Sequence, residues 1–74
     1  MLRVECYASH RGDQTPRVLY IDERKVFVEE VMDTWHGPDH RYFKLKGDDG
    51  DVYVIRQDTT AGNWELTTFR RGGP

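Results

Sequence analysis

Apolar and polar residues alternate over short stretches of this chain, and clusters of turn-forming residues separate the stretches. Alternation with a period of two is typical of a strand that buries one face. No stretch has the apolar spacing of an amphipathic helix. The pattern therefore predicts an all-β fold of five or six antiparallel strands, with strands over residues 2–8, 17–21, 25–35, 41–46, 51–57 and 64–69.

The third of these stretches changes its alternation part way along. Val26 and Val28 alternate, but Val31 follows only after two consecutive glutamates, Glu29 and Glu30. One extra residue at this point is the pattern of a β-bulge, which bends its strand. A long bent strand favours a small barrel-like or strongly rolled sheet over a flat one.

The most distinct hairpin surrounds Asp48 and Asp49, where a two-residue turn would pair Lys46 with Asp51. This register predicts a core face of Phe43, Leu45, Val52 and Val54 and an opposite face of Tyr42, Lys44, Lys46, Asp51, Tyr53 and Ile55. A loop longer by one residue would reverse this alignment, because neighbouring residues of a strand point to opposite faces. Over the whole sheet, the expected core is Val4, Cys6, Val26, Val28, Val31, Phe43, Leu45, Val52, Val54, Trp64 and Leu66.

Length and composition limit the chain to one small domain. Its 74 residues and 8.7 kDa leave no room for a second core. Val, Ile, Thr, Tyr, Phe and Trp supply 24 residues, whereas Ala, Leu and Met supply 8, and this balance favours strands. We expect a single β domain over residues 1–69 and a disordered tail over residues 70–74.

Two features of the sequence bear on the cellular compartment. No apolar run is long enough to span a membrane, and the N-terminus, with Arg3 and Glu5, does not have the pattern of a signal peptide. Cys6 is the only cysteine, which excludes a disulfide within the chain and a cysteine-based zinc site. We expect a cytoplasmic protein without a membrane contact or a cofactor, either a monomer or a weak dimer.

Charge alone predicts no partner, because charges of both signs are interspersed and the net charge is −2. The predicted outer side of the hairpin, however, combines aromatic and basic residues. Such a surface stacks unpaired bases and neutralises phosphates in proteins that bind single-stranded nucleic acid. It is equally typical of an amphipathic sheet cover or of a protein-contact surface. The candidate binding residues are Arg41, Tyr42, Lys44, Lys46, Tyr53 and Arg56.

Candidate catalytic and metal-binding residues are few. Cys6 falls on the predicted core face and has no identifiable partners beyond the histidines at 10, 36 and 40, so we interpret it as a small core residue. His36 and His40 flank Gly37-Pro38, which excludes a helix that would place them on one face as metal ligands. Whether a loop brings them to a metal stays open. We therefore expect no enzyme, and a small metal-dependent or cysteine-based enzyme is the least favoured alternative.

Two further motifs have ordinary structural interpretations. Asp48, Asp49 and Asp51 lack the spacing and the closing glutamate of a calcium loop, and we interpret them as turn residues. Arg11-Gly12-Asp13 matches a tripeptide of secreted adhesion proteins, and we interpret it as a turn as well.

An ordered set of motifs runs through the second half of the chain: Val31-x-Asp33-x-Trp35, Arg41-Tyr42-Phe43-Lys44-Leu45, Asp49-Gly50-x-Val52-Tyr53-x-Ile55-x-x-Asp58 and Trp64-Glu65-Leu66. Over residues 24–68 the chain resembles a small bacterial domain family of unknown function. Members of that family occur alone and near the C-terminal end of proteins similar to error-prone Y-family DNA polymerases. The resemblance implies a bacterial, cytoplasmic module with a neighbourhood in DNA repair or mutagenesis.

Small size, surplus aromatic residues and the absence of a catalytic constellation lead to one functional expectation. We expect a non-catalytic protein-interaction module whose partner the sequence does not identify. The alternative is a single-stranded nucleic-acid-binding module that uses the basic and aromatic surface.

Overall fold

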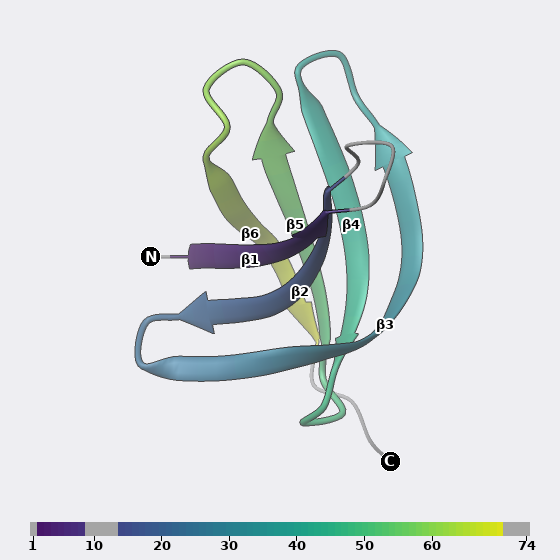
Figure 1. Ribbon diagram of the computed structural model, residues 1–74. Coiled ribbons are helices and arrows are strands. Elements are labelled where there is room, and N and C mark those ends of the chain that lie inside the picture. The colour runs from purple at the N-terminus through teal and green to yellow at the C-terminus, as the bar shows by residue number, and fades with distance from the viewer. Residues whose placement is uncertain (1, 9–13, 71–74) are drawn as a thin grey trace.

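The computed structural model describes residues 2–8 and 14–70. It contains six strands: β1 (Leu2–Ala8), β2 (Gln14–Ile21), β3 (Arg24–His36), β4 (His40–Gly47), β5 (Val52–Asp58) and β6 (Trp64–Arg70). Each strand pairs antiparallel with the next, so the strand order in the sheet follows the chain (Figure 1). The described residues contain no helix, and therefore none of a length and apolarity that would cross a membrane. The predicted all-β fold of antiparallel strands is confirmed.

Strand β3 bends the sheet. Its first residues pair with β2 as far as Phe27, and from Val28 onward it pairs with β4. The register shifts between Val28 and Glu30, which confirms the predicted bulge, and shifts again between Val31 and Asp33. As a result β1, β2 and the first part of β3 lie across β4, β5 and β6, and the sheet is a strongly curled half-barrel (Figure 1).

The core lies on the inner side of this curl. Its buried apolar side chains are Leu19, Val26, Phe43, Leu45, Tyr53 and Ile55, and Leu2, Val4, Ile21, Val28 and Trp64 pack against them. The structure thus confirms Val26, Phe43 and Leu45 as buried core residues. Val4, Val28 and Trp64 contribute from the margin of the core, as half-buried side chains.

The predicted register of the β4–β5 hairpin is wrong by one residue. Lys46 lies opposite Val52, and Leu45 lies opposite Tyr53. The cause is a three-residue loop that ends in Gly50, whose φ of +84° extends the turn by a residue. Tyr53 and Ile55 therefore enter the core, while Val52 and Val54 are half-buried on the other side of the sheet.

Two other predicted core residues, Val31 and Leu66, are each 37% exposed. Their partners across the strands, Leu45 and Ile55, are buried, so both residues lie on the inner side as expected. They remain exposed because β6 and the second part of β3 each pair with a neighbour on one side only. A half-barrel leaves the inner side of such edge strands uncovered.

Candidate interaction surfaces

The predicted binding residues divide between the two sides of the sheet. Tyr42, Lys44, Lys46 and Arg56 share one side, because Tyr42 lies opposite Arg56 and the two lysines lie opposite Val54 and Val52. We call this side of β3–β6 the outer face. Trp35 and Arg70 join it, since they lie opposite Tyr42 and Val52.

Tyr53 does not belong to the outer face, and its prediction as a surface aromatic is wrong. Its side chain is completely buried on the inner side, opposite Leu45. The one-residue shift of the hairpin register is the reason.

Arg41 also lies apart from the outer face. Its guanidinium carbon is 5.1 Å from the centre of the Phe43 ring, and its charge reaches Cys6. Burial raises the pKa of the half-buried Cys6 thiol, and Arg41 only partly offsets this. The surroundings of Cys6 therefore disfavour the thiolate form that a cysteine nucleophile requires.

An aromatic pair dominates one end of the outer face. The rings of Trp35 and Tyr42 are stacked, with centroids 5.3 Å apart and planes within 1° of parallel. Trp35 remains 39% exposed. The sequence did not predict that Trp35 belongs to this surface. Its position depends on how β3 pairs with β4 across two bulges, and a local pattern of residues does not reveal this pairing.

A groove of about 440 Å³ lies beside this pair on the outer face. Its lining is mainly apolar and consists of Met32, Trp35, Lys44, Val52, Val54, Thr68 and Arg70. The described residues that line it include two cations, Lys44 and Arg70, and no carboxylate. We call it the outer groove.

The cations of the outer face differ in their partners. Arg56 lies 3.3 Å from Glu65, and hydrogen bonds to Glu65 and Tyr42 raise the pKa of its guanidinium. Among residues 2–8 and 14–70, by contrast, no carboxylate forms an ion pair with Lys44, Lys46 or Arg70. Asp33 and Glu30 lie on the same face, opposite Lys44 and Lys46, so the outer face carries charges of both signs. The cations that line the outer groove itself are Lys44 and Arg70.

A second groove, of about 680 Å³, lies where β1 crosses β6 (Figure 1). Its apolar lining comes from both ends of the chain and consists of Leu2, Val4, Ile21, Trp64 and Leu66. Arg3, Asp22, Asn63 and Glu65 supply its polar lining. We call it the β1–β6 groove.

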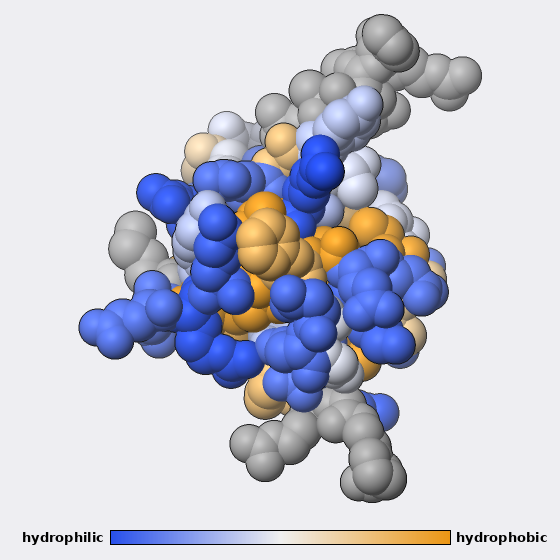
Figure 2. Space-filling model, turned by 60° about the horizontal axis from the view of Figure 1, so that its bottom comes forward, coloured by the Kyte–Doolittle hydropathy of each residue, from blue (hydrophilic) through white to orange (hydrophobic). Residues whose placement is uncertain are grey.

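Large apolar side chains are exposed at several other points. Tyr7, Phe27, Met32 and Phe69 are each between 43% and 58% exposed. At the end of the molecule that carries the β4–β5 turn, apolar surface is enclosed by hydrophilic side chains (Figure 2). Phe69 follows Leu66 on the inner side of β6, where its ring lies 5.1 Å from that of Tyr53.

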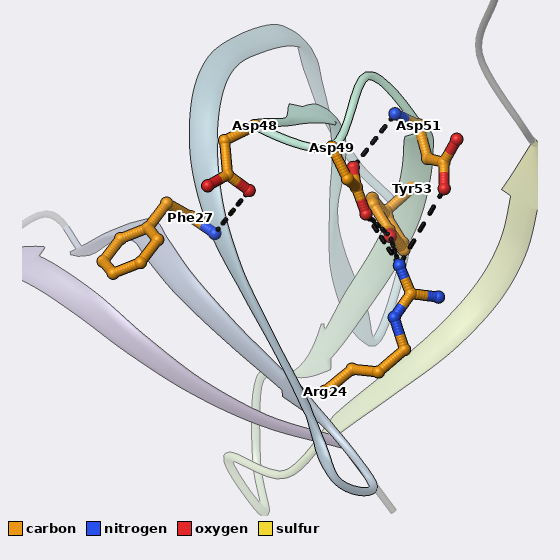
Figure 3. Close-up of polar contacts among 6 residues, drawn as sticks. All are labelled: Arg24, Phe27, Asp48, Asp49, Asp51 and Tyr53. Atoms are coloured by element: carbon orange, nitrogen blue, oxygen red, sulfur yellow. Dashed lines mark hydrogen bonds and ion pairs between the residues drawn. The ribbon is translucent and has the colours of Figure 1, made fainter.

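The three aspartates of the β4–β5 turn have structural partners. Asp49 accepts hydrogen bonds from Tyr53 (2.6 Å) and Arg24 (2.8 Å), and Asp48 accepts one from the amide of Phe27 (3.3 Å) (Figure 3). Arg24 also lies 3.9 Å from Asp51. These contacts fasten the β4–β5 turn to β3, in agreement with the interpretation of the aspartates as turn residues.

The predicted metal candidates are not brought together. His40 lies 4.0 Å from Asp58, and His36 lies across the strands from Arg41. Within the described residues, no three side chains of His, Cys, Asp or Glu form a group that could hold a metal ion. His10 and the Arg11-Gly12-Asp13 motif lie outside the described residues.

Comparison with known proteins does not assign the chain to a group: no family model, curated protein or solved structure matches it. Its function therefore has to be inferred from the geometry of these surfaces.

Proposed function

We propose that this chain is a non-catalytic protein-interaction module that binds an extended peptide segment of a partner along β6. One observation carries the proposal. Leu66 and Phe69 lie on the inner side of an edge strand, yet they remain 37% and 43% exposed. A strand added beside β6 would cover both side chains and complete the inner side of the half-barrel there.

Edge strands present unpaired backbone groups, so an extended peptide gains affinity from main-chain hydrogen bonds and specificity from its alternate side chains. The free edge of β3 is less suited to this, because two register shifts interrupt it and Glu29, Glu30 and Asp33 line it with negative charge. Edge β6 has one register shift and carries two charged residues of opposite sign, Glu65 and Arg70.

The neighbouring β1–β6 groove indicates what the peptide should look like. Side chains that point inward from an added strand would meet Leu2, Val4 and Leu66, so they should be apolar. Side chains at the positions between them would point to solvent. The proposed ligand is therefore a peptide with apolar residues at every second position.

The test starts from random peptides displayed on phage and selected against the immobilised protein. We expect the selected sequences to alternate apolar and polar residues. A synthetic peptide from this set should shift the amide NMR signals of residues 64–70 and the indole signal of Trp64. Methylating the backbone nitrogens that face β6 should abolish these shifts, because strand addition depends on the peptide's own N–H groups.

Two substitutions distinguish peptide binding at the edge of β6 from binding at the free edge of β3. Leu66→Lys should reduce peptide affinity at least about tenfold, since it places a charge against the apolar peptide side chains. Val31→Lys is the matched control, because Val31 is also 37% exposed on the inner side of an edge strand. Equal losses in both variants, or no alternating sequence among the selected peptides, would overturn the proposal. A dimer in sedimentation that Leu66→Lys dissociates would make a second copy of the chain the occupant.

A further inference from the structure

We infer that the outer groove, on the opposite side of the sheet from Leu66 and Phe69, is a second site, and that its ligand is a single-stranded nucleic acid. The cations of the groove favour an anionic ligand. Lys44 and Arg70 line it, Lys46 lies next to Lys44 on the same side of β4, and none of the described residues that line the groove is a carboxylate. Asp33 and Glu30 lie across the strands from Lys44 and Lys46, but among the described residues neither carboxylate forms an ion pair with these lysines, and Arg70 has no ion pair either. The three cations can therefore turn toward a phosphate.

Trp35 supplies an aromatic ring beside these cations. The indole of Trp35 is stacked on Tyr42 and also lines the groove, while 39% of the residue is exposed. Because the stack with Tyr42 fixes its orientation, little side-chain freedom is lost when a base packs against the indole. An ordered indole beside unpaired cations combines the base stacking and the phosphate contacts of proteins that bind single strands.

Met32, Val52 and Val54 make part of the groove lining apolar. An unpaired base has apolar faces and loses exposed area when it packs there. A free inorganic anion would use the cations but gain nothing from this apolar lining. The observations therefore favour a ligand that carries aromatic rings and negative charges together.

The chain contains two tryptophans, and each reports on one proposed site. The indole N–H signal of Trp35 monitors the outer groove, and that of Trp64 monitors the β1–β6 groove. Titration of the labelled protein with a short oligothymidylate should shift the Trp35 signal and leave the Trp64 signal unchanged. The β6 peptide should do the opposite, so failure at one site does not affect the conclusion about the other.

The oligothymidylate affinity should depend on salt and on the named residues. Two or three phosphate contacts imply an affinity about 7- to 20-fold lower at about 200 mM salt than at about 50 mM. Trp35→Ala should weaken binding about 5- to 100-fold through lost stacking. Lys44→Ala should weaken it and reduce the salt dependence by about one phosphate contact. Lys25→Ala is the matched control, because it removes the same charge from an exposed position in the first part of β3.

Three results would overturn the inference. The first is an unchanged Trp35 signal at low salt and high oligothymidylate concentration. The second is an equal loss of affinity in Lys44→Ala and Lys25→Ala. The third is competition by an acidic peptide of the same charge at the same concentration, which would make the outer groove a site for acidic protein segments. If Trp35→Ala does not fold, Lys44→Gln combined with Lys46→Gln tests the same prediction, because it removes two cations without placing like charges opposite Asp33 and Glu30.

Discussion

The Tyr53 hydroxyl lies at the end of a buried side chain, and its surroundings determine how it ionises. Burial, together with the hydrogen bond to Asp49, raises the pKa of Tyr53 to about 12. In the unfolded chain a tyrosine titrates near pH 10. The folded state therefore favours the protonated phenol, and this contribution to stability is complete below about pH 10 and is lost as the pH rises to about 12.

We expect the free energy of unfolding to fall by roughly 2 to 3 kcal/mol between these two pH values because of Tyr53 alone. Urea denaturation at a series of pH values would measure it, with Tyr53→Phe as the reference. That variant should lack this part of the pH dependence, while other alkaline effects should remain in both proteins. The same fall in Tyr53→Phe and in the unsubstituted protein would show that the hydroxyl ionises freely in the fold.

At the scale of elements, two glycines of the β4–β5 hairpin should respond differently to substitution. A Cβ at Gly47 would lie 2.5 Å from Val26 and 2.6 Å from Asp49, whereas a Cβ at Gly50 would meet nothing within 4 Å. Gly50 instead needs its φ of +84°, which disfavours alanine by about 1 to 2 kcal/mol. Gly47→Ala should cost more, about 3 kcal/mol, because the core has to move.

Asparagine tolerates a positive φ, so Gly50→Asn should be milder than Gly50→Ala. Urea denaturation of the three variants should therefore rank the loss of stability as Gly47→Ala, then Gly50→Ala, then Gly50→Asn. A larger loss for Gly50→Ala than for Gly47→Ala would contradict the close packing of Gly47 against Val26.

The same hairpin shows how far the sequence could predict the fold. Alternation placed all six strands, and the two glutamates placed the first bulge of β3, because both features are local. The register of β5 depended on whether the turn held two residues or three. That single choice moved Tyr53 from the predicted binding surface to the core and left Val52 in the outer groove.

The candidate sites were less predictable than the strands, since they depend on pairing between strands. Trp35 reaches the outer groove only through two register shifts in β3. The β1–β6 groove joins residues from opposite ends of the chain, which no local pattern indicates. Leu66 is exposed because the curled sheet ends at β6, which pairs with a neighbouring strand on one side only.

The half-barrel of the whole molecule is open, so we expect the strands to differ in their stability against local opening. Strands β4 and β5 are paired on both sides, whereas β6 is paired on one side and contributes the exposed Leu66 and Phe69. Local opening of β6 breaks one set of strand-to-strand hydrogen bonds, whereas opening of β4 or β5 breaks two. The amides of β6 should therefore exchange with solvent through local opening, faster than those of β4 and β5.

Hydrogen exchange followed by NMR would measure this difference directly. In the free protein, the amides of β6 that bond to β5 should have lower protection factors than the amides between β4 and β5. A peptide bound along β6 should raise the protection of β6 toward that of β4, because binding turns an edge strand into a central one. Oligothymidylate in the outer groove would contact Thr68 and Arg70 of β6, so it should also slow the local opening of β6, but it adds no hydrogen bonds along the free edge. Equal protection of β4, β5 and β6 in the free protein would mean that the half-barrel opens only as one unit, which would contradict the predicted local opening of β6.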